Sequence, residues 1–359
     1  MKKINSNIKS AHTLDGEFYC SDKVFKLVKE KIFETSWQFV CSQEEISESD
    51  TVLPFYFLEN FIAEPLMLLN NNNRISCLSN VCTHRGNILV EEKTKIKNKI
   101  VCNYHGKTFD KEGEFCFMPE TDGMKNFPCK NDNLTKVKSS NFFQFIFVSL
   151  DPILPLNDIL KEMTDRISWL PFHNLKLRKD LSKSYEIDAN WALYCDNYLE
   201  GFHIPFIHKD LNATLDYKKY DVEIFKYSNL QIGYAEKNEI CFNIPSSCQD
   251  HGEKIAAYYF WIFPNMMFNF YPWGLSINIV KPLDVKKTKI DFLSFVWDDS
   301  KLNLGAGADL DKVELEDEEI VQRVQKGVGS RFYKNGRFSP KMEKGVHHFH
   351  SLISEFLFK

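Results

Sequence analysis

The hydrophobic pattern of the first 150 residues changes from helical to strand-like spacing. Between residues 22 and 33, apolar side chains recur at intervals that place them on one face of a helix. Further on, apolar segments of strand length alternate with turn residues, and the run 142–150 is typical of a single buried strand. The pattern predicts a helical segment over residues 1–35 that packs on the C-terminal domain, followed by an all-β domain over 36–150.

Residues 151–359 mix helical and strand patterns, which predicts a second domain and an overall α+β fold class. The helical patterns cover residues 157–170, 190–200, 309–327 and 348–358, and the strand patterns cover 183–190, 254–263, 266–271, 275–280 and 288–296. Because the last four strands are joined by short turns, we expect them to form a curved antiparallel sheet.

Composition and charge make the chain a globular protein without an obvious polymeric partner. It has 359 residues with 43% hydrophobic content, and its net charge of −4 arises from 45 basic and 49 acidic residues without a long block of one sign. Neither nucleic acid nor an anionic membrane is therefore expected as a partner. No apolar run reaches the length of a membrane helix, and the ten cysteines lack regular spacing, so we expect a cytoplasmic protein with reduced thiols.

Two mixed pairs of cysteine and histidine carry the first chemical signal. Cys82 and His84 are separated by one residue, Cys102 and His105 by two, and seventeen residues lie between the pairs. In a Rieske site two thiolates bind one iron of a [2Fe–2S] cluster and two imidazoles bind the other, which raises the potential above that of an all-cysteine cluster. The pairs therefore predict a one-electron carrier.

Structural zinc is the main alternative for these four side chains. A zinc finger usually pairs Cys with Cys and His with His, whereas both pairs here are mixed, and a single residue between Cys82 and His84 is too few for a zinc knuckle. Gly86 and Gly106 follow the histidines, as expected where backbone N–H groups approach sulfide. These features favour the Rieske cluster.

A second dense stretch over residues 190–208 contains His203 and His208. Five positions are too many for one regular helical face, so a break near Gly201 and Pro205 must bring the two rings together. Two imidazoles can bind iron, zinc or copper, and an added carboxylate gives the facial triad of non-haem Fe(II) oxygenases. Alone, this pair is weak evidence for a metal site.

With these motifs in view, the chain resembles the catalytic α subunits of Rieske non-haem iron oxygenases over essentially its full length. Within that family it is most similar to the branch acting on quaternary ammonium compounds, which includes choline monooxygenase, carnitine oxygenase and glycine betaine demethylase. The segments that carry the resemblance are the two Cys-His pairs, residues 196–208, 264–274 and 324–350.

The resemblance implies a Rieske domain beside a helix-grip (START-like) catalytic domain over residues 151–359. It carries the Fe(II) ligands over to His203, His208 and Asp317, because the family's carboxylate stands eight residues before the position of Gln325. Four glutamates crowd around Asp317, so spacing without the resemblance does not choose among the acids. These glutamates are Glu314, Glu316, Glu318 and Glu319.

The resemblance also implies catalytic roles for Glu200 and Asn197. Glu200 occupies the position of the acid that bridges a Rieske histidine of one subunit to an iron-binding histidine of its neighbour, which implies a homotrimer. We expect His105 rather than His84 to be that Rieske histidine. One departure from the family is Lys107, where many members have Trp; packing, or the surface that faces the electron donor, is expected to differ there.

The implied activity is O₂-dependent hydroxylation or N-demethylation of a small quaternary ammonium substrate. Electrons come from a separate flavin- or ferredoxin-type reductase, so NAD(P)H acts only indirectly. Because a quaternary cation has no N–H donor, recognition needs an aromatic cage. The candidates for this cage are Tyr194, Phe202, Trp261, Phe263, Phe270, Tyr271 and Trp273. The alternatives are an aromatic-ring hydroxylating dioxygenase, a Rieske electron-transfer protein and a non-catalytic ligand-binding module.

Overall fold

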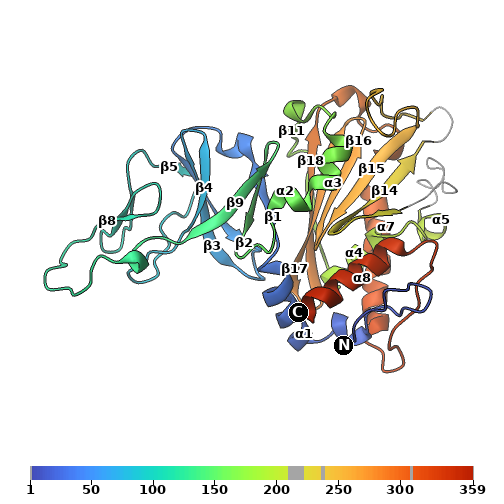
Figure 1. The fold of residues 1–359 in the computed structure, drawn as a ribbon, viewed down its shortest axis with the longest axis horizontal. Helices are drawn as coiled ribbons and strands as arrows, with labels where there is room; N and C mark the ends of the chain where they lie inside the picture. The colour runs from blue at the N-terminus through green and yellow to red at the C-terminus, as the bar shows by residue number, and fades with distance from the viewer. Residues whose placement is uncertain (1, 209–221, 236–238, 308–309, 359) are drawn as a thin grey trace. The chain divides into compact units, whose positions relative to one another are not determined.

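The computed structural model describes residues 2–208, 222–235, 239–307 and 310–358. The chain forms two compact units, one made of residues 34–156 and the other of residues 1–33 together with 157–359. Figure 1 shows both units as ribbons. In the described part of the chain, no helix is long and apolar enough to span a membrane.

The unit of residues 34–156 is built from antiparallel strands. Its larger sheet has the order β1-β10-β9-β4-β3-β2-β5, and its smaller sheet has the order β6-β7-β8. The strands are β1 (Gln38–Ser42), β2 (Thr51–Phe57), β3 (Glu64–Asn71), β4 (Arg74–Ser79), β5 (Thr94–Lys95), β6 (Ile100–Val101), β7 (Thr108–Phe109), β8 (Phe115–Phe117), β9 (Lys136–Phe142) and β10 (Phe145–Ser149). The predicted all-β region is confirmed.

The prediction of one strand over 142–150 was wrong at its start. Phe142 ends β9 and pairs with Phe145, the first residue of β10. Between them Phe143 adopts a φ of 47°, in the left-handed region that tight turns use. Because the turn itself carries an apolar side chain, the hydrophobic pattern runs through it without a break.

The second unit contains the large antiparallel sheet that the sequence predicted. Its order is β11-β18-β17-β16-β15-β14-β13, with β12 also pairing with β18. The strands are β11 (Lys176–Leu177), β12 (Lys183–Ile187), β13 (Val222–Ile224), β14 (Ser228–Tyr234), β15 (Ile255–Ile262), β16 (Met266–Tyr271), β17 (Gly274–Asp284) and β18 (Lys287–Val296). Strands β13 and β14 were not predicted, because the buried positions of β14 include the polar residues Asn229 and Gln231.

Helices from the middle and from the C-terminal end of the chain pack with this sheet. Helix α4 contacts strand β17 and helices α7 and α8, and α8 also contacts β13. The helices are α1 (Asp22–Val28), which continues into a π-helical turn (Lys29–Phe33), α2 (Leu156–Ile159), α3 (Lys161–Ile167), α4 (Trp191–Tyr198), α5 (Ile204–Ile207), α7 (Leu310–Val328) and α8 (Lys344–Leu357). The sheet and these helices together hold the site described below.

Helix α8 passes close to the end of α4 at Gly345, where an added Cβ atom would overlap the carbonyl oxygen of Leu199. We expect Gly345→Ala to destabilise the protein by about 1–3 kcal/mol, because backbone must shift to relieve this overlap. Chemical denaturation followed by circular dichroism measures the effect. Gly327→Ala in α7 is the matched control, since nothing lies within 4 Å of its added Cβ. Equal destabilisation by the two changes would contradict the close approach.

Candidate active site

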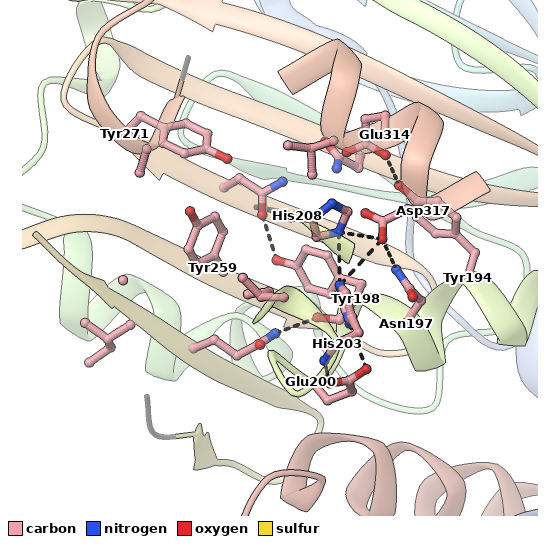
Figure 2. Close-up of a pocket in the computed structure, with 18 residues that line it drawn as sticks. Tyr194, Asn197, Tyr198, Glu200, His203, His208, Tyr259, Tyr271, Glu314 and Asp317 are labelled. Carbon is pink, nitrogen blue, oxygen red and sulfur yellow. Dashed lines mark hydrogen bonds and ion pairs between the residues drawn. The ribbon is translucent and has the colours of Figure 1, made fainter. Parts of the chain in front are cut away.

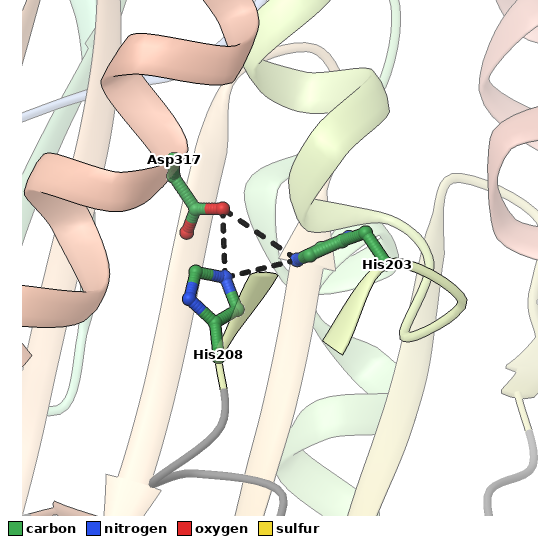
Figure 3. A group of neighbouring side chains, drawn as sticks. All are labelled: His203, His208 and Asp317. Carbon is green, nitrogen blue, oxygen red and sulfur yellow. Dashed lines mark hydrogen bonds and ion pairs between the residues drawn. The ribbon is translucent and has the colours of Figure 1, made fainter. Parts of the chain in front are cut away.

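Two histidines come together just beyond the end of helix α4. The helix is fixed at its start by Asn190, whose side-chain oxygen accepts a hydrogen bond from the backbone of Ala192 at 3.1 Å. After Tyr198 the chain turns into the four-residue helix α5. This turn brings His203 Nε2 to 3.2 Å from His208 Nε2 (Figure 3), as the predicted break in the helix requires.

Asp317 on helix α7 completes a cluster of three side chains. Its Oδ1 lies 2.9 Å from His208 Nε2 and 3.5 Å from His203 Nε2. One nitrogen or oxygen atom from each residue lies within 4.8 Å of the others. Two imidazoles and one carboxylate are the donor set of a mononuclear non-haem iron site, so the residues present fit that group.

The acids around Asp317 have other partners. Glu314 accepts a hydrogen bond from Tyr194 Oη at 2.5 Å, and Glu319 pairs with Arg323 on the exposed side of the helix. Glu316 contacts the outer nitrogen of His208, while Glu318 Oε1 is buried without a hydrogen-bond partner in the described structure. Of the five neighbouring acids, Asp317 is the one that reaches both histidines.

Further carboxylates orient the two rings from outside. Glu200 Oε1 lies 2.8 Å from His203 Nδ1, and Glu316 Oε2 lies 2.8 Å from His208 Nδ1. If each outer nitrogen carries the proton, both Nε2 atoms are free to act as ligands. Asn197 Nδ2 donates to Asp317 Oδ1 at 2.6 Å and so orients the third member. The predicted catalytic pair Glu200 and Asn197 thus lies against the cluster.

Two neighbouring carboxylates raise the pKa of His208. Burial disfavours the imidazolium, but hydrogen bonds and the negative charges of Asp317 and Glu316 outweigh burial and raise the pKa of His208 to about 8. A positive charge is therefore stabilised between these carboxylates. A bound metal cation would take the place of this proton.

A pocket opens beside the cluster (Figure 2). Tyrosine rings and amide side chains form much of its wall, together with the three cluster residues. Its further lining residues are Tyr194, Asn197, Tyr198, Glu200, Ile204, Gln231, Ile232, Gly233, Tyr259, Asn269, Tyr271, Asn278, Ala306, Val313 and Glu314. Sequence reasoning missed the contributions of Tyr198, Tyr259 and the residues of β14. For Tyr198, its place in the motif of residues 196–208 was an available signal.

Of the seven predicted cage residues, Tyr194 and Tyr271 line this pocket and the other five do not. Three of the five pack in the interior: Trp261 lies 5.2 Å from Phe349, Phe263 lies 4.7 Å from Phe356, and Phe270 lies 5.8 Å from Phe172, all between ring centroids. Trp273 stacks on Tyr271, with ring centroids 5.2 Å apart, and Phe202 is 43% exposed. Strand alternation explains why Phe270 does not line the pocket, because its side chain points to the opposite face of the sheet from Asn269 and Tyr271.

Glu314 is a further acid of the pocket wall, beside Glu200 and Asp317. Burial and the nearby Asp317 raise the pKa of Glu314 to about 8, while the hydrogen bond from Tyr194 opposes this rise. Among the lining residues that the structure describes there is no lysine and no arginine. The chemistry of the wall is therefore aromatic, hydrogen-bonding and acidic.

The two Cys-His pairs lie in the other unit. Cys82 and Cys102 belong to its hydrophobic core together with Phe109 and Leu134. The rings of His84 and His105 lie beside each other, with centroids 4.6 Å apart, and His84 Nδ1 is buried without a hydrogen-bond partner in the described structure. Two adjacent imidazoles, one with a free buried nitrogen, fit the histidine side of a Rieske cluster.

The thiol side of this site is equally suited to bind metal. The sulfur of Cys102 accepts hydrogen bonds from the backbone N–H groups of Tyr104 and His105. Burial opposes ionisation, but these bonds and the neighbouring Cys82 thiol outweigh burial and lower the pKa of Cys102. Since thiolate is the form that binds metal, the loop favours ligation.

Two family models match ranges of the chain that contain the two sites. Residues 174–357 match the model described as "Ring hydroxylating alpha subunit (catalytic domain)", and residues 36–128 match the "Rieske [2Fe-2S] domain". The Cys-His pairs lie within the second match, and the His203, His208 and Asp317 cluster lies within the first.

Curated relatives and solved structures are similar over nearly the whole chain. The chloroplastic choline monooxygenase of Arabidopsis thaliana is 27% identical, with 96% of this chain and 83% of the relative covered. The carnitine monooxygenase oxygenase subunit of Escherichia coli K12 is 26% identical, with 98% and 95% covered. A solved quaternary ammonium Rieske monooxygenase superposes with a TM-score of 0.78 at 25% identity and 99% coverage of both chains. Naphthalene 1,2-dioxygenase from Rhodococcus sp. shares the fold, with a TM-score of 0.71 at 19% identity and coverage of 96% and 93%.

Proposed function

This chain belongs to the ring-hydroxylating α-subunit family of Rieske non-haem iron oxygenases, and from that premise we propose that it hydroxylates a small quaternary ammonium compound. Membership makes it the catalytic subunit of an oxidoreductase whose electrons come from a separate reductase. The substrate class goes beyond what family membership establishes and is the part that we propose. The observation that carries it is a tyrosine-lined, acid-containing pocket directly beside His203, His208 and Asp317.

In this proposal the [2Fe–2S] cluster is held by Cys82, His84, Cys102 and His105, and Fe(II) by the His203, His208 and Asp317 cluster. When bound, these groups supply single-electron transfer and activation of O₂ toward a substrate C–H bond.

The chain's own groups prepare the site for that chemistry. Glu200 holds the outer nitrogen of His203, and Glu316 holds that of His208. Asn197 fixes the Asp317 oxygen that faces both rings. Outer contacts of this kind set ring orientation and ligand basicity, and their loss typically costs about 10–100-fold in metal affinity or activity. We propose these three as positioning residues of the iron site.

The pocket wall suits a cation without N–H donors. Tyrosine faces attract such a cation through their quadrupoles, and a bound cation would favour the ionised form of Glu314, whose pKa burial raises to about 8. A negatively charged substrate would instead meet acids on a wall whose described residues include no basic side chain. The activities named for the choline and carnitine relatives point in the same direction.

Assembly and location belong to the same proposal. We propose a homotrimer in which Glu200, whose Oε1 lies 2.8 Å from His203 Nδ1, also accepts from a histidine of a partner subunit, so that each iron is served by a neighbouring cluster. A cytoplasmic location stays a prediction, and among the relatives the plant enzymes are named as chloroplastic.

The experiment is oxygen uptake with a compatible reductase and a panel of methylated amines, among them choline, glycine betaine and carnitine. Hydroxylation of an N-methyl group would release formaldehyde, and hydroxylation elsewhere would give an alcohol or aldehyde, so product analysis identifies the C–H bond attacked. We expect 3,3-dimethylbutanol, the uncharged isostere of choline, to bind about tenfold more weakly than choline, within the range of a desolvated cation–π contact. Turnover of aromatic acids with no turnover of amines would refute the substrate class.

A further inference from the structure

Lys107 follows the second Cys-His pair directly and is almost completely buried, with 1% exposure. The family resemblance singled out this position because many members have Trp there. Because its side chain is buried, Lys107 affects the packing around the two loops that carry the Cys-His pairs and not the protein surface. Since lysine is almost never fully buried unless it is paired, its partners define its role.

Aromatic rings and one carboxylate surround the Lys107 ammonium. Nζ lies 5.8 Å, 5.3 Å and 5.7 Å from the ring centroids of Phe109, Phe115 and Phe127. It donates a hydrogen bond to Asp132 Oδ1 at 2.8 Å. Cation–π contacts and a charge-assisted hydrogen bond stabilise an ammonium group at this buried position.

The same pair connects both cluster loops. Cys102 N donates to the Lys107 carbonyl oxygen at 2.8 Å, which ties Lys107 to the second loop. The carbonyl oxygen of Asp132 accepts a hydrogen bond from Thr83 Oγ1 at 2.8 Å, and Thr83 lies between the two residues of the first Cys-His pair. The ion pair therefore sits at fixed positions relative to the ligands of both loops.

The two charges of the pair do not act equally on the cluster. The Lys107 side chain is 2% exposed and that of Asp132 is 17% exposed, so water screens the carboxylate more than the ammonium. The Lys107 ammonium lies over the ring of Phe109, which belongs to the same core cluster as Cys82 and Cys102. The less screened positive charge is thus held beside the core residues that supply the thiolates.

We propose that Lys107 is a positioning residue that raises the reduction potential of the Rieske cluster. Reduction adds one electron to the cluster, and a buried cation nearby favours the more negative state. The inference rests on the proposed cluster ligands and is independent of the substrate. Its consequence is a cluster that takes electrons from its donor more readily than a relative with an uncharged residue at this position.

The test is a redox titration of the purified full-length holoprotein, followed by the visible absorption of the cluster. We expect Lys107→Met to lower the potential so that reduction is about tenfold less favourable, which for one electron is about 59 mV. Lys107→Arg should retain the wild-type reduction potential because it keeps the positive charge. Lys111→Met is the matched control, since Lys111 is also paired, with Asp50, in the same unit.

A wild-type potential in Lys107→Met with full cluster content would overturn the proposal, as would an equal shift in Lys111→Met. Should Lys107→Met fail to retain the cluster, Asp132→Asn decides. Removing the opposing charge should raise the potential above wild type, whereas an unchanged or lower value would overturn the proposal. Absence of cluster absorption in the wild-type protein would instead refute the proposed ligands, and amine turnover tests the substrate separately.

Discussion

Replacing His203 with alanine is expected to abolish product formation while leaving the visible absorption of the Rieske cluster unchanged. His203 Nε2 faces both His208 Nε2 and Asp317 Oδ1, at 3.2 Å and 3.5 Å. Its removal leaves one imidazole and one carboxylate, which is too few protein ligands for the facial triad. Because loss of an outer contact alone can cost about 10–100-fold, loss of this ligand should exceed about 10²-fold.

Oxygen uptake, product analysis and iron content measure this outcome together. Total iron should fall from about three to about two atoms per subunit, since one mononuclear site is lost and one two-iron cluster is kept. His173→Ala is the control, because His173 is an exposed histidine of the same unit. Oxygen uptake that stays coupled to product in His203→Ala would show that the iron lies elsewhere.

Replacing Cys82 with serine should give the opposite spectroscopic result, namely loss of the visible cluster spectrum. Cys82 is 2% exposed and lies in the core cluster with Cys102. A serine hydroxyl does not supply the thiolate that an Fe–S cluster requires. Iron should fall to about one atom per subunit, and turnover should stop because electrons no longer enter.

Cys77→Ser separates ligation from burial. Cys77 is also 2% exposed, lies in strand β4 and is a free thiol. The two changes therefore bury the same hydroxyl group in the same unit. We expect Cys77→Ser to lower stability but to keep the cluster absorption. The reverse pattern, with the spectrum lost in Cys77→Ser and kept in Cys82→Ser, would disprove the proposed ligands.

The metal ligands could be predicted from sequence because few residue types bind iron and their spacing is short. His203 and His208 were recognisable as a pair, although only the fold shows that the turn after α4 brings their Nε2 atoms together. Asp317 needed the family resemblance. Five acids lie within six positions, and the contacts that distinguish them depend on which side of α7 meets α4.

The pocket wall could not be predicted in the same way. Alternation along a strand assigns a face, but it does not say what lies over that face at each position. Tyr259 and Trp261 point to the same side of β15, yet Tyr259 lines the pocket while Trp261 packs against Phe349 on α8. Strand β14 escaped prediction because Gln231 and Gly233, which line the pocket, interrupt its apolar pattern.

The carboxylate of Glu200 can accept only a limited number of further hydrogen bonds. A carboxylate offers about four lone-pair positions. Glu200 already accepts from the backbone of Phe202, from the backbone of His203 and from the His203 ring. About one position is left. An imidazole from a second copy of the chain would saturate the acceptor, so the number of subunits that each iron site can engage through Glu200 is limited to one.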